Sequence, residues 1–233
     1  MIRKAIHPLQ PNNSFFNVRK FKHTMEGVPC FILGNAPSID DISIHKLDDF
    51  FTLGINRIFK KDNFDPTILM WQDTELWLTE RFALSKLQAV KLAKAGSDPK
   101  GRSYSFKLER GPFRFPITLD TLHGCGSTGV LAFEFAYTLG CNPIIILGCD
   151  CKYRDGKTDF YGKNKYHKPQ TLVNCNRGIN WIAKSNCGRK IINCSDTDIL
   201  GPHISLEDAI SQISPLYEGR GREHFMKRLF SKM

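Results

Sequence analysis

The segment 143–148, Pro-Ile-Ile-Ile-Leu-Gly, constrains the fold more than any other part of the chain. Its unbroken apolar run, rich in β-branched side chains, is typical of a strand buried on both faces in the middle of a parallel sheet. An apolar helix with a period near 3.6 precedes it and ends at Gly140. The apolar positions of that helix are Val130, Leu131, Phe133, Phe135, Ala136 and Leu139. This pair predicts the core of an α/β domain.

Four further apolar runs predict the remaining strands, at 28–33, 51–56, 67–71 and 190–193. Between the first two we expect a helix that begins near Ile39, with Ser38 as its N-cap. Strand, helix and strand in this order imply a right-handed parallel crossover. A polar loop at 149–169 precedes a helix through Ile179, Trp181 and Ile182. The prediction is one Rossmann-like domain over residues 1–233, a mostly parallel sheet flanked by helices.

Two segments stand apart from this core. Residues 95–123 are rich in glycine, proline and charge and contain short β-like runs such as 104–106, which predicts an inserted lid or acceptor segment. Residues 217–233 form a basic tail that could be a short amphipathic helix.

The net charge of +10 is concentrated in a few stretches. Residues 1–27 carry five basic and one acidic side chain, and 217–233 carry five and two. Residues 86–114 carry eight basic and two acidic side chains. For any single lysine a solvated surface position is the better explanation, but the clustering predicts an anionic ligand or acceptor.

No apolar run reaches the roughly 18 residues that suggest a membrane span, and the N-terminus lacks the apolar core of a signal peptide. We therefore expect a cytoplasmic protein, with a peripheral position at the inner membrane as an option. The eight cysteines form no CxxC pair, and several lie in apolar or strand-like contexts, which favours reduced thiols. Neither cysteine nor histidine spacing fits a metal centre, so no metal site is predicted.

Three polar segments follow predicted strands, where parallel sheets bind ligands. They are 34–38 (Gly-Asn-Ala-Pro-Ser), 56–57 (Asn-Arg) and 148–150 (Gly-Cys-Asp). In the first, Gly34 would let the backbone approach a ligand and Pro37 would fix the turn, although an ordinary strand-to-helix turn explains the loop equally well. The segment 126–129 (Gly-Ser-Thr-Gly) is a second candidate anion cradle, with plain helix capping as its alternative. No GK[ST] ending or GxGxxG fingerprint occurs.

Taken in order, the segments 31–39, 54–56, 127–130 and 146–150 resemble the bacterial sialyltransferases of glycosyltransferase family 42. More loosely, they resemble archaeal-type pterin pyrophosphokinases and motility-associated proteins that share the GNxPS loop. The match spans about residues 28–195 and leaves the lid unmatched. The resemblance implies a metal-independent glycosyltransferase that uses a nucleotide-sugar, of CMP type, with no further cofactor.

The resemblance also assigns roles to single residues. Asn35, Asn56, Ser127 and Thr128 would contact the donor nucleotide, and His167 would be the catalytic base. Histidine suits that work because its pKa lies near neutral pH. The predicted donor site as a whole comprises Gly34, Asn35, Pro37, Ser38, Asn56, Ser127, Thr128, Gly148 and Asp150.

The sequence departs from that family in two places. The family's tyrosines that hold the departing phosphate are shifted here, so the candidates for this role are Lys152, Tyr153, Arg154 and Tyr161, and cations can neutralise the developing charge. The family's sugar-recognising arginine is replaced by 124–126 (Gly-Cys-Gly), which leaves the donor sugar undetermined.

Other functions remain open at this level. Asp73 and Asp150 could hold a divalent ion for a pyrophosphokinase of a pterin-like substrate, or Asp150 could simply bond backbone amides. A non-enzymatic nucleotide or nucleic-acid binding module is the third alternative, and His123 is a fallback acid or base. The acceptor could be hydroxymethylated DNA, which suits the basic lid, or a membrane-associated surface oligosaccharide, which suits the basic tail.

Overall fold

A computed structural model describes residues 17–108, 122–124, 126–162, 164, 169–185, 188–216, 223–224 and 226–227. Within these ranges the protein is built on one seven-stranded sheet in the order β5-β4-β3-β2-β1-β6-β7, and every strand pairs in parallel with its neighbours. The strands are β1 (Cys30–Leu33), β2 (Thr52–Ile55), β3 (Ile68–Trp71), β4 (Val90–Lys94), β5 (Tyr104–Phe106), β6 (Ile144–Leu147) and β7 (Ile191–Cys194).

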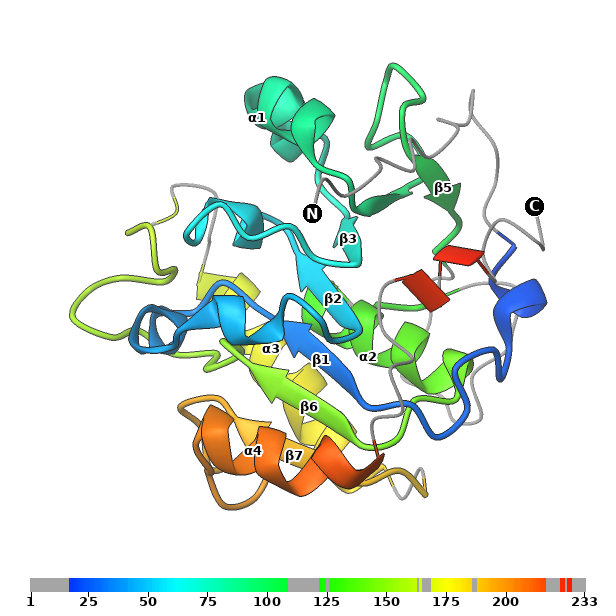
Figure 1. Cartoon of the computed structure of the whole chain (residues 1–233). Coiled ribbons are helices and arrows are strands. Elements are labelled where there is room, and N and C mark those ends of the chain that lie inside the picture. Colours follow the sequence, from blue (N-terminus) through cyan, green and yellow to red (C-terminus); the bar gives the residue numbers. More distant parts are fainter. Residues whose placement is uncertain are drawn as a thin grey trace.

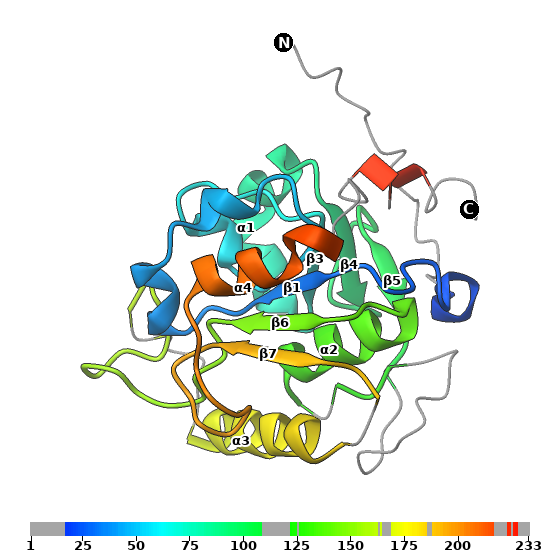
Figure 2. The ribbon, with the colours of Figure 1, turned by 60° about the horizontal axis from the view of Figure 1, so that its bottom comes forward.

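Helices cover both faces of the sheet (Figure 1). They are α1 (Thr74–Lys86), α2 (Thr128–Leu139), α3 (Pro169–Lys184) and α4 (Leu206–Ile213). Figure 2 shows α1 and α4 on one face and α2 and α3 on the other, and each pair packs on its own buried apolar cluster. The predicted α/β Rossmann-like architecture is confirmed.

The neighbouring strands β1 and β6 lie inside the sheet, and all of their residues are buried. They pair in register, with Leu33 opposite Leu147. From β1 the chain proceeds outward to β5 on one side, and from β6 it proceeds to β7 on the other. Connections therefore leave in opposite directions at β1 and β6, and parallel sheets place their ligand crevice at such a switch point.

The prediction of one helix beginning near Ile39 is wrong, because the segment forms two short 3-10 helices. Two short 3-10 helices, Pro37–Asp41 and Ile44–Leu47, occupy this connection, and the N-cap of the first is Ala36. Ser38 lies inside the helix and its hydroxyl bonds to Asp150 instead of capping. Further 3-10 helices are Val18–Phe21, Ile58–Lys60 and Ser214–Leu216.

The predicted lid is wrong for its first part. Residues 104–106 form the edge strand β5, with Tyr104 and Phe106 buried in the core, because β4 supplies a parallel partner for them. Residues 109–121 and most of the basic tail lie outside the described part of the chain. None of the described helices combines the length and the apolar character that crossing a bilayer requires.

Candidate functional site

A cleft of about 360 Å³ opens at the carboxyl ends of the central strands. Its wall combines the turns after β1, β2 and β6 with the start of α2 and the middle of α3. Of the predicted donor site, it contains Asn35, Asn56, Ser127, Thr128, Gly148 and Asp150. The fold thus brings together residues from four separate predicted segments, at the switch point of the sheet.

Two glycines join the turns after β1 and β6. A Cβ on Gly34 would lie 2.0 Å from the carbonyl oxygen of Gly148, and the amide of Ala36 donates to that same oxygen over 2.9 Å. Gly148 itself has a φ of 61°, in the left-handed region that favours glycine. Gly34 therefore serves the contact between two turns. Neither Gly34 nor the predicted donor-site residues Pro37 and Ser38 line the cleft.

Asn35 is the most informative side chain of the cleft. It is only 6% exposed, and its amide nitrogen donates to the carbonyl of Ile55 over 3.1 Å, which ties the turn after β1 to the end of β2. Within the described residues, its side-chain oxygen Oδ1 is buried and has no hydrogen-bond partner. Buried polar atoms almost always have partners. An acceptor left open in a cleft wall is therefore suited to a donor on a ligand.

Asn56 and Arg57 follow directly after β2. Asn56 has a φ of 48°, a conformation that asparagine tolerates better than most residues, and its amide donates to the carbonyl of Met70. The Arg57 guanidinium donates to the carboxylates of Glu75 over 2.8 Å and Glu80 over 3.1 Å. Burial lowers the pKa of Arg57, but the hydrogen bonds to these two carboxylates together outweigh it, so the pKa is raised. The positive charge of Arg57 in the cleft wall is therefore balanced by the two carboxylates.

The start of α2 faces the cleft with its first backbone amides. Ser127 is the N-cap residue, as predicted, but its hydroxyl makes no capping hydrogen bond, and the first turn contains no acidic residue. The Thr128 hydroxyl accepts from the side chain of Gln72 over 3.3 Å. Because the N-terminal amides of a helix lack intrahelical partners, this end of α2 can bind an anionic group.

A buried carboxylate holds the segment 123–124, which leads into α2. Glu134, in the middle of α2, accepts from the amides of His123 and Gly124, each over 2.9 Å. Burial raises the pKa of the Glu134 carboxyl, and the two amides and His123 lower it. The His123 ring nitrogen Nδ1 lies 3.7 Å from the Glu134 carboxylate, and His123 is buried and does not line the cleft. The residue named as the fallback acid or base is therefore an interior residue.

Asp150 is buried and fully engaged. One of its oxygens accepts from the Ser38 hydroxyl over 2.6 Å and from the Asp196 amide over 3.0 Å, and the other accepts from the Ser38 amide over 3.1 Å. Burial raises its pKa, and these hydrogen bonds oppose the rise. Asp150 thus links the loops after β1, β6 and β7. This agrees with the alternative prediction that Asp150 accepts hydrogen bonds from backbone amides. The described residues contain no group of three His, Cys, Asp or Glu suited to a metal ion.

The candidates for the leaving phosphate are dispersed. Lys152 lines the cleft and pairs with Asp196 over 2.8 Å. Arg154 pairs with Asp41 over 2.6 Å outside the lining, Tyr153 is exposed, and Tyr161 lies under the guanidinium of Arg57. His167, the predicted base, lies outside the described residues.

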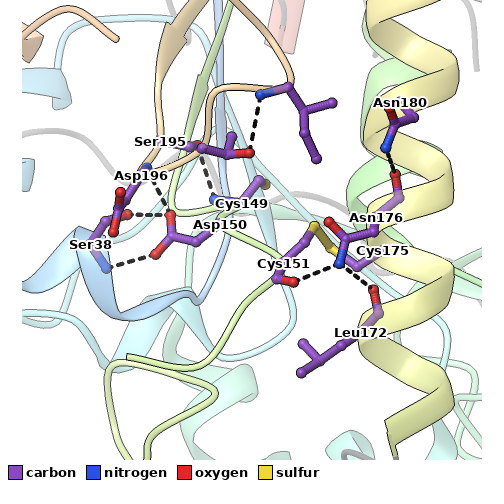
Figure 3. The surroundings of a disulfide bond; sticks show 12 residues. Ser38, Cys149, Asp150, Cys151, Leu172, Cys175, Asn176, Asn180, Ser195 and Asp196 are labelled. Carbon is purple, nitrogen blue, oxygen red and sulfur yellow. Dashed lines mark hydrogen bonds between the residues drawn. A yellow bond between two sulfur atoms is a disulfide. The ribbon is translucent and has the colours of Figure 1, made fainter. Parts of the chain in front are cut away.

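A disulfide between Cys151 and Cys175 joins the loop after β6 to α3 at the edge of the cleft (Figure 3). The expectation of reduced thiols is wrong for this pair, because the fold brings the two Cα atoms to 5.4 Å, within disulfide range. The side chain of Asn176 also donates to the carbonyl of Cys151 over 2.9 Å. The loop is thus attached to α3 twice. Cys30, Cys141, Cys149 and Cys194 are free and buried.

Several lining residues escaped sequence reasoning. Glu75 and Leu76 come from α1, which no sequence pattern predicted, and Thr158 and Asp159 come from the loop after β6. The hydroxyl of Thr158 donates to Asp159 over 2.8 Å. The amide of Phe160 donates to the carbonyl of Asn35 over 2.8 Å, which holds this loop over the turn after β1. Arg57 and Asp73 also line the cleft, and both are candidates named from the sequence.

No protein-family model and no curated protein sequence matches the chain. Among solved structures, the MAf glycosyltransferase from Magnetospirillum magneticum AMB-1 is similar, with a TM-score of 0.52 and 16% sequence identity. The alignment covers 91% of this chain and 43% of that protein, so this chain spans less than half of its length. At this identity the similarity establishes a shared fold.

Proposed function

We propose that the chain is a glycosyltransferase that moves a sugar from a nucleotide-sugar, of CMP type, to an acceptor hydroxyl. The single observation that carries the proposal is the open acceptor of Asn35 in the same cleft as the uncapped start of α2. A nucleotide needs both features: an acceptor for an N–H group of its base or a hydroxyl of its ribose, and amide donors for its phosphate. The glycosyltransferase with a similar fold supports the assignment.

The proposed reaction is a direct displacement. The acceptor hydroxyl loses its proton to His167 and its oxygen forms a bond to the anomeric carbon, while the bond from that carbon to the phosphate oxygen breaks. The nucleotide monophosphate leaves with the electron pair. Lys152 and the first amides of α2 would neutralise the charge that develops on the phosphate. No metal ion takes part in this scheme.

The finer identity of the substrates belongs to the same proposal. The acceptor is a surface oligosaccharide or hydroxymethylated DNA. Salt distinguishes them, because binding of a DNA acceptor weakens steeply with salt whereas binding of a neutral glycan does not. Asp150 supports the pyrophosphokinase alternative poorly, since hydrogen bonds from Ser38 and Asp196 engage both of its oxygens.

A nucleotide panel tests the proposal. The melting temperature is measured with CMP, UDP, GDP and ATP, each with magnesium and with EDTA, because a ligand that binds the folded state stabilises it. We expect CMP to raise the melting temperature most and to do so equally in EDTA. Stabilisation by ATP alone, and only with magnesium, would contradict the proposal and favour phosphoryl transfer.

A further inference from the structure

The outer face of α1 carries an exposed apolar ridge. Leu78 and Phe82 are one helical turn apart and are 57% and 73% exposed. A single exposed apolar side chain needs no explanation, but these two lie on the same face of the helix and form one apolar ridge. Arg81 lies beside it, with its guanidinium 5.0 Å from the Phe82 ring, and the exposed Lys86 follows in the last turn.

A small basic pocket adjoins the ridge. It lies between α1 and the loop that connects β4 to β5, which Figure 1 places beside α1. Its lining residues are Trp71, Trp77, Arg81, Leu84, Ser85, Lys91, Asp98 and Arg102. The volume is about 20 Å³, enough for one oxygen atom of a larger group at the surface.

The charge of this pocket is positive. Arg81, Lys91 and Arg102 line this pocket together with one carboxylate, that of Asp98, whose oxygens accept from the Lys100 amide and the Ser103 hydroxyl. The Lys91 ammonium donates to the backbone carbonyls of Leu87 and Ala89. In the described part of the chain, no salt bridge joins Arg81 or Arg102 to a carboxylate. The pocket is therefore suited to an anionic group such as a phosphate.

The combination identifies the partner. An apolar ridge flanked by cations is how helices that lie on membranes contact a bilayer, with apolar side chains among the acyl chains and cations at the headgroups. A nucleic acid would use the cations but would gain little from Leu78. We propose that the face formed by α1 and the 95–103 loop docks on a bilayer containing anionic phospholipids, with a headgroup phosphate at Arg81 and Arg102.

Docking by this face would bring the cleft close to the membrane. Glu75 and Leu76, in the first turn of α1, line the cleft, while Leu78 and Phe82 lie on the outer face of the same helix. A membrane-anchored acceptor would then be near the donor site. Vesicle binding without nucleotide tests the docking by itself, so its failure is distinct from failure of the glycosyltransferase assignment.

The experiment is cosedimentation of the full chain with vesicles of phosphatidylcholine alone or mixed with phosphatidylglycerol. We expect binding only to the mixed vesicles. Leu78→Ser/Phe82→Ser should weaken it by about tenfold or more, from the lost apolar burial. Arg81→Gln/Arg102→Gln should weaken it roughly tenfold through the lost attraction to anionic headgroups.

A matched control lies across the sheet. Val173 on α3 is 48% exposed and Lys184 ends the same helix. Val173→Ser/Lys184→Gln should bind as the parent does. The altered residues Leu78 and Phe82 are exposed, so the melting temperature should stay unchanged. As a second readout, the emission of Phe82→Trp should shift to the blue when anionic vesicles are added.

Three outcomes would overturn the proposal. One is parental vesicle binding by both double variants. Another is binding to duplex DNA that Arg81→Gln/Arg102→Gln abolishes, together with vesicle binding that Leu78→Ser/Phe82→Ser leaves unchanged. The third is a concentration-dependent dimer that the ridge substitutions abolish while vesicle binding persists.

Discussion

Asn35 and Asp150 make an informative pair because each lies in the turn after one of two neighbouring strands, β1 and β6, and both are buried. Asp150 has both oxygens engaged by Ser38 and Asp196. Asn35 uses its nitrogen on Ile55, whereas its oxygen has no partner among the described residues. The protein thus supplies hydrogen-bond partners for both carboxylate oxygens of Asp150 but for only the nitrogen of the Asn35 amide.

This difference separates support from recognition. A buried polar atom without a partner costs free energy, and a ligand that donates a hydrogen bond would remove this cost. Asp150 in the turn after β6 holds the neighbouring loops together, and we interpret the open acceptor of Asn35 as the group offered to a ligand. Substitution of Asp150, in the turn after β6, should therefore reduce the stability of the fold. Substitution of Asn35, in the turn after β1, should reduce ligand binding.

The largest effect is expected where the two turns touch. Gly34→Ala places a methyl group 2.0 Å from the carbonyl oxygen of Gly148, which cannot move aside without displacing the turn. We expect the free energy of unfolding, measured with urea, to fall by roughly 4 kcal/mol. Gly129→Ala is the control, since its nearest neighbour would be 3.7 Å away. Equal stability of the two variants would refute the close contact.

Removal of the Asp150 carboxylate should be the next largest change. Asp150→Ala leaves the Ser38 hydroxyl and the amides of Ser38 and Asp196 without their acceptor. Unsatisfied buried donors of this kind should lower the free energy of unfolding by about 3 kcal/mol. Chemical denaturation measures this loss. A loss no greater than that of an exposed control, Asp198→Ala, would mean that Asp150 does not hold the loops.

The disulfide is a second support on the same side of the cleft. Cys151→Ser/Cys175→Ser removes a link across 24 residues and should lower the free energy of unfolding by about 2 kcal/mol. A thiol reductant should produce the same loss in the parent and none in the variant. If the reductant affects both alike, the stabilising link is elsewhere.

The smallest effect is a pH dependence. Burial raises the pKa of the Asp150 carboxyl above its ordinary 3.8, so the folded state binds this proton more tightly than the unfolded state does. The resulting stability is present below about pH 3.8 and lost as the pH rises through the folded pKa. The stability of the parent relative to Asp150→Asn should therefore fall with rising pH. Asn35→Ala should keep the parental slope, and an Asp150→Asn profile parallel to the parent's would contradict the shift.

The sequence predicted the strands whose apolar runs are unbroken, since burial on both faces leaves a plain signal there. It missed β4, because Lys91 and Lys94 interrupt the run, and it missed α1, because Leu78 and Phe82 face outward and blur the helical pattern. The edge strand β5 has three residues and is specified by its partner β4 more than by its own composition.

The site was predictable where it follows strand ends and unpredictable where it depends on tertiary contacts. Asn35 and Asn56 come directly after strands, so the sequence placed them in one region. Ser38 was predicted as a helix cap because its partner Asp150 is 112 residues away. The pairing of Cys151 with Cys175 likewise depends on how the loop lies on α3, which spacing does not encode.

Calorimetric titration of CMP into the parent and Asn35→Ala tests the central claim most directly. The lost acceptor should weaken CMP binding by about tenfold or more, while the free energy of unfolding changes by only about 1 kcal/mol. Asn180→Ala, which removes an amide that bonds within α3, should bind CMP as the parent does. Parental CMP affinity in Asn35→Ala would contradict the account, because the open acceptor would then have no part in recognition.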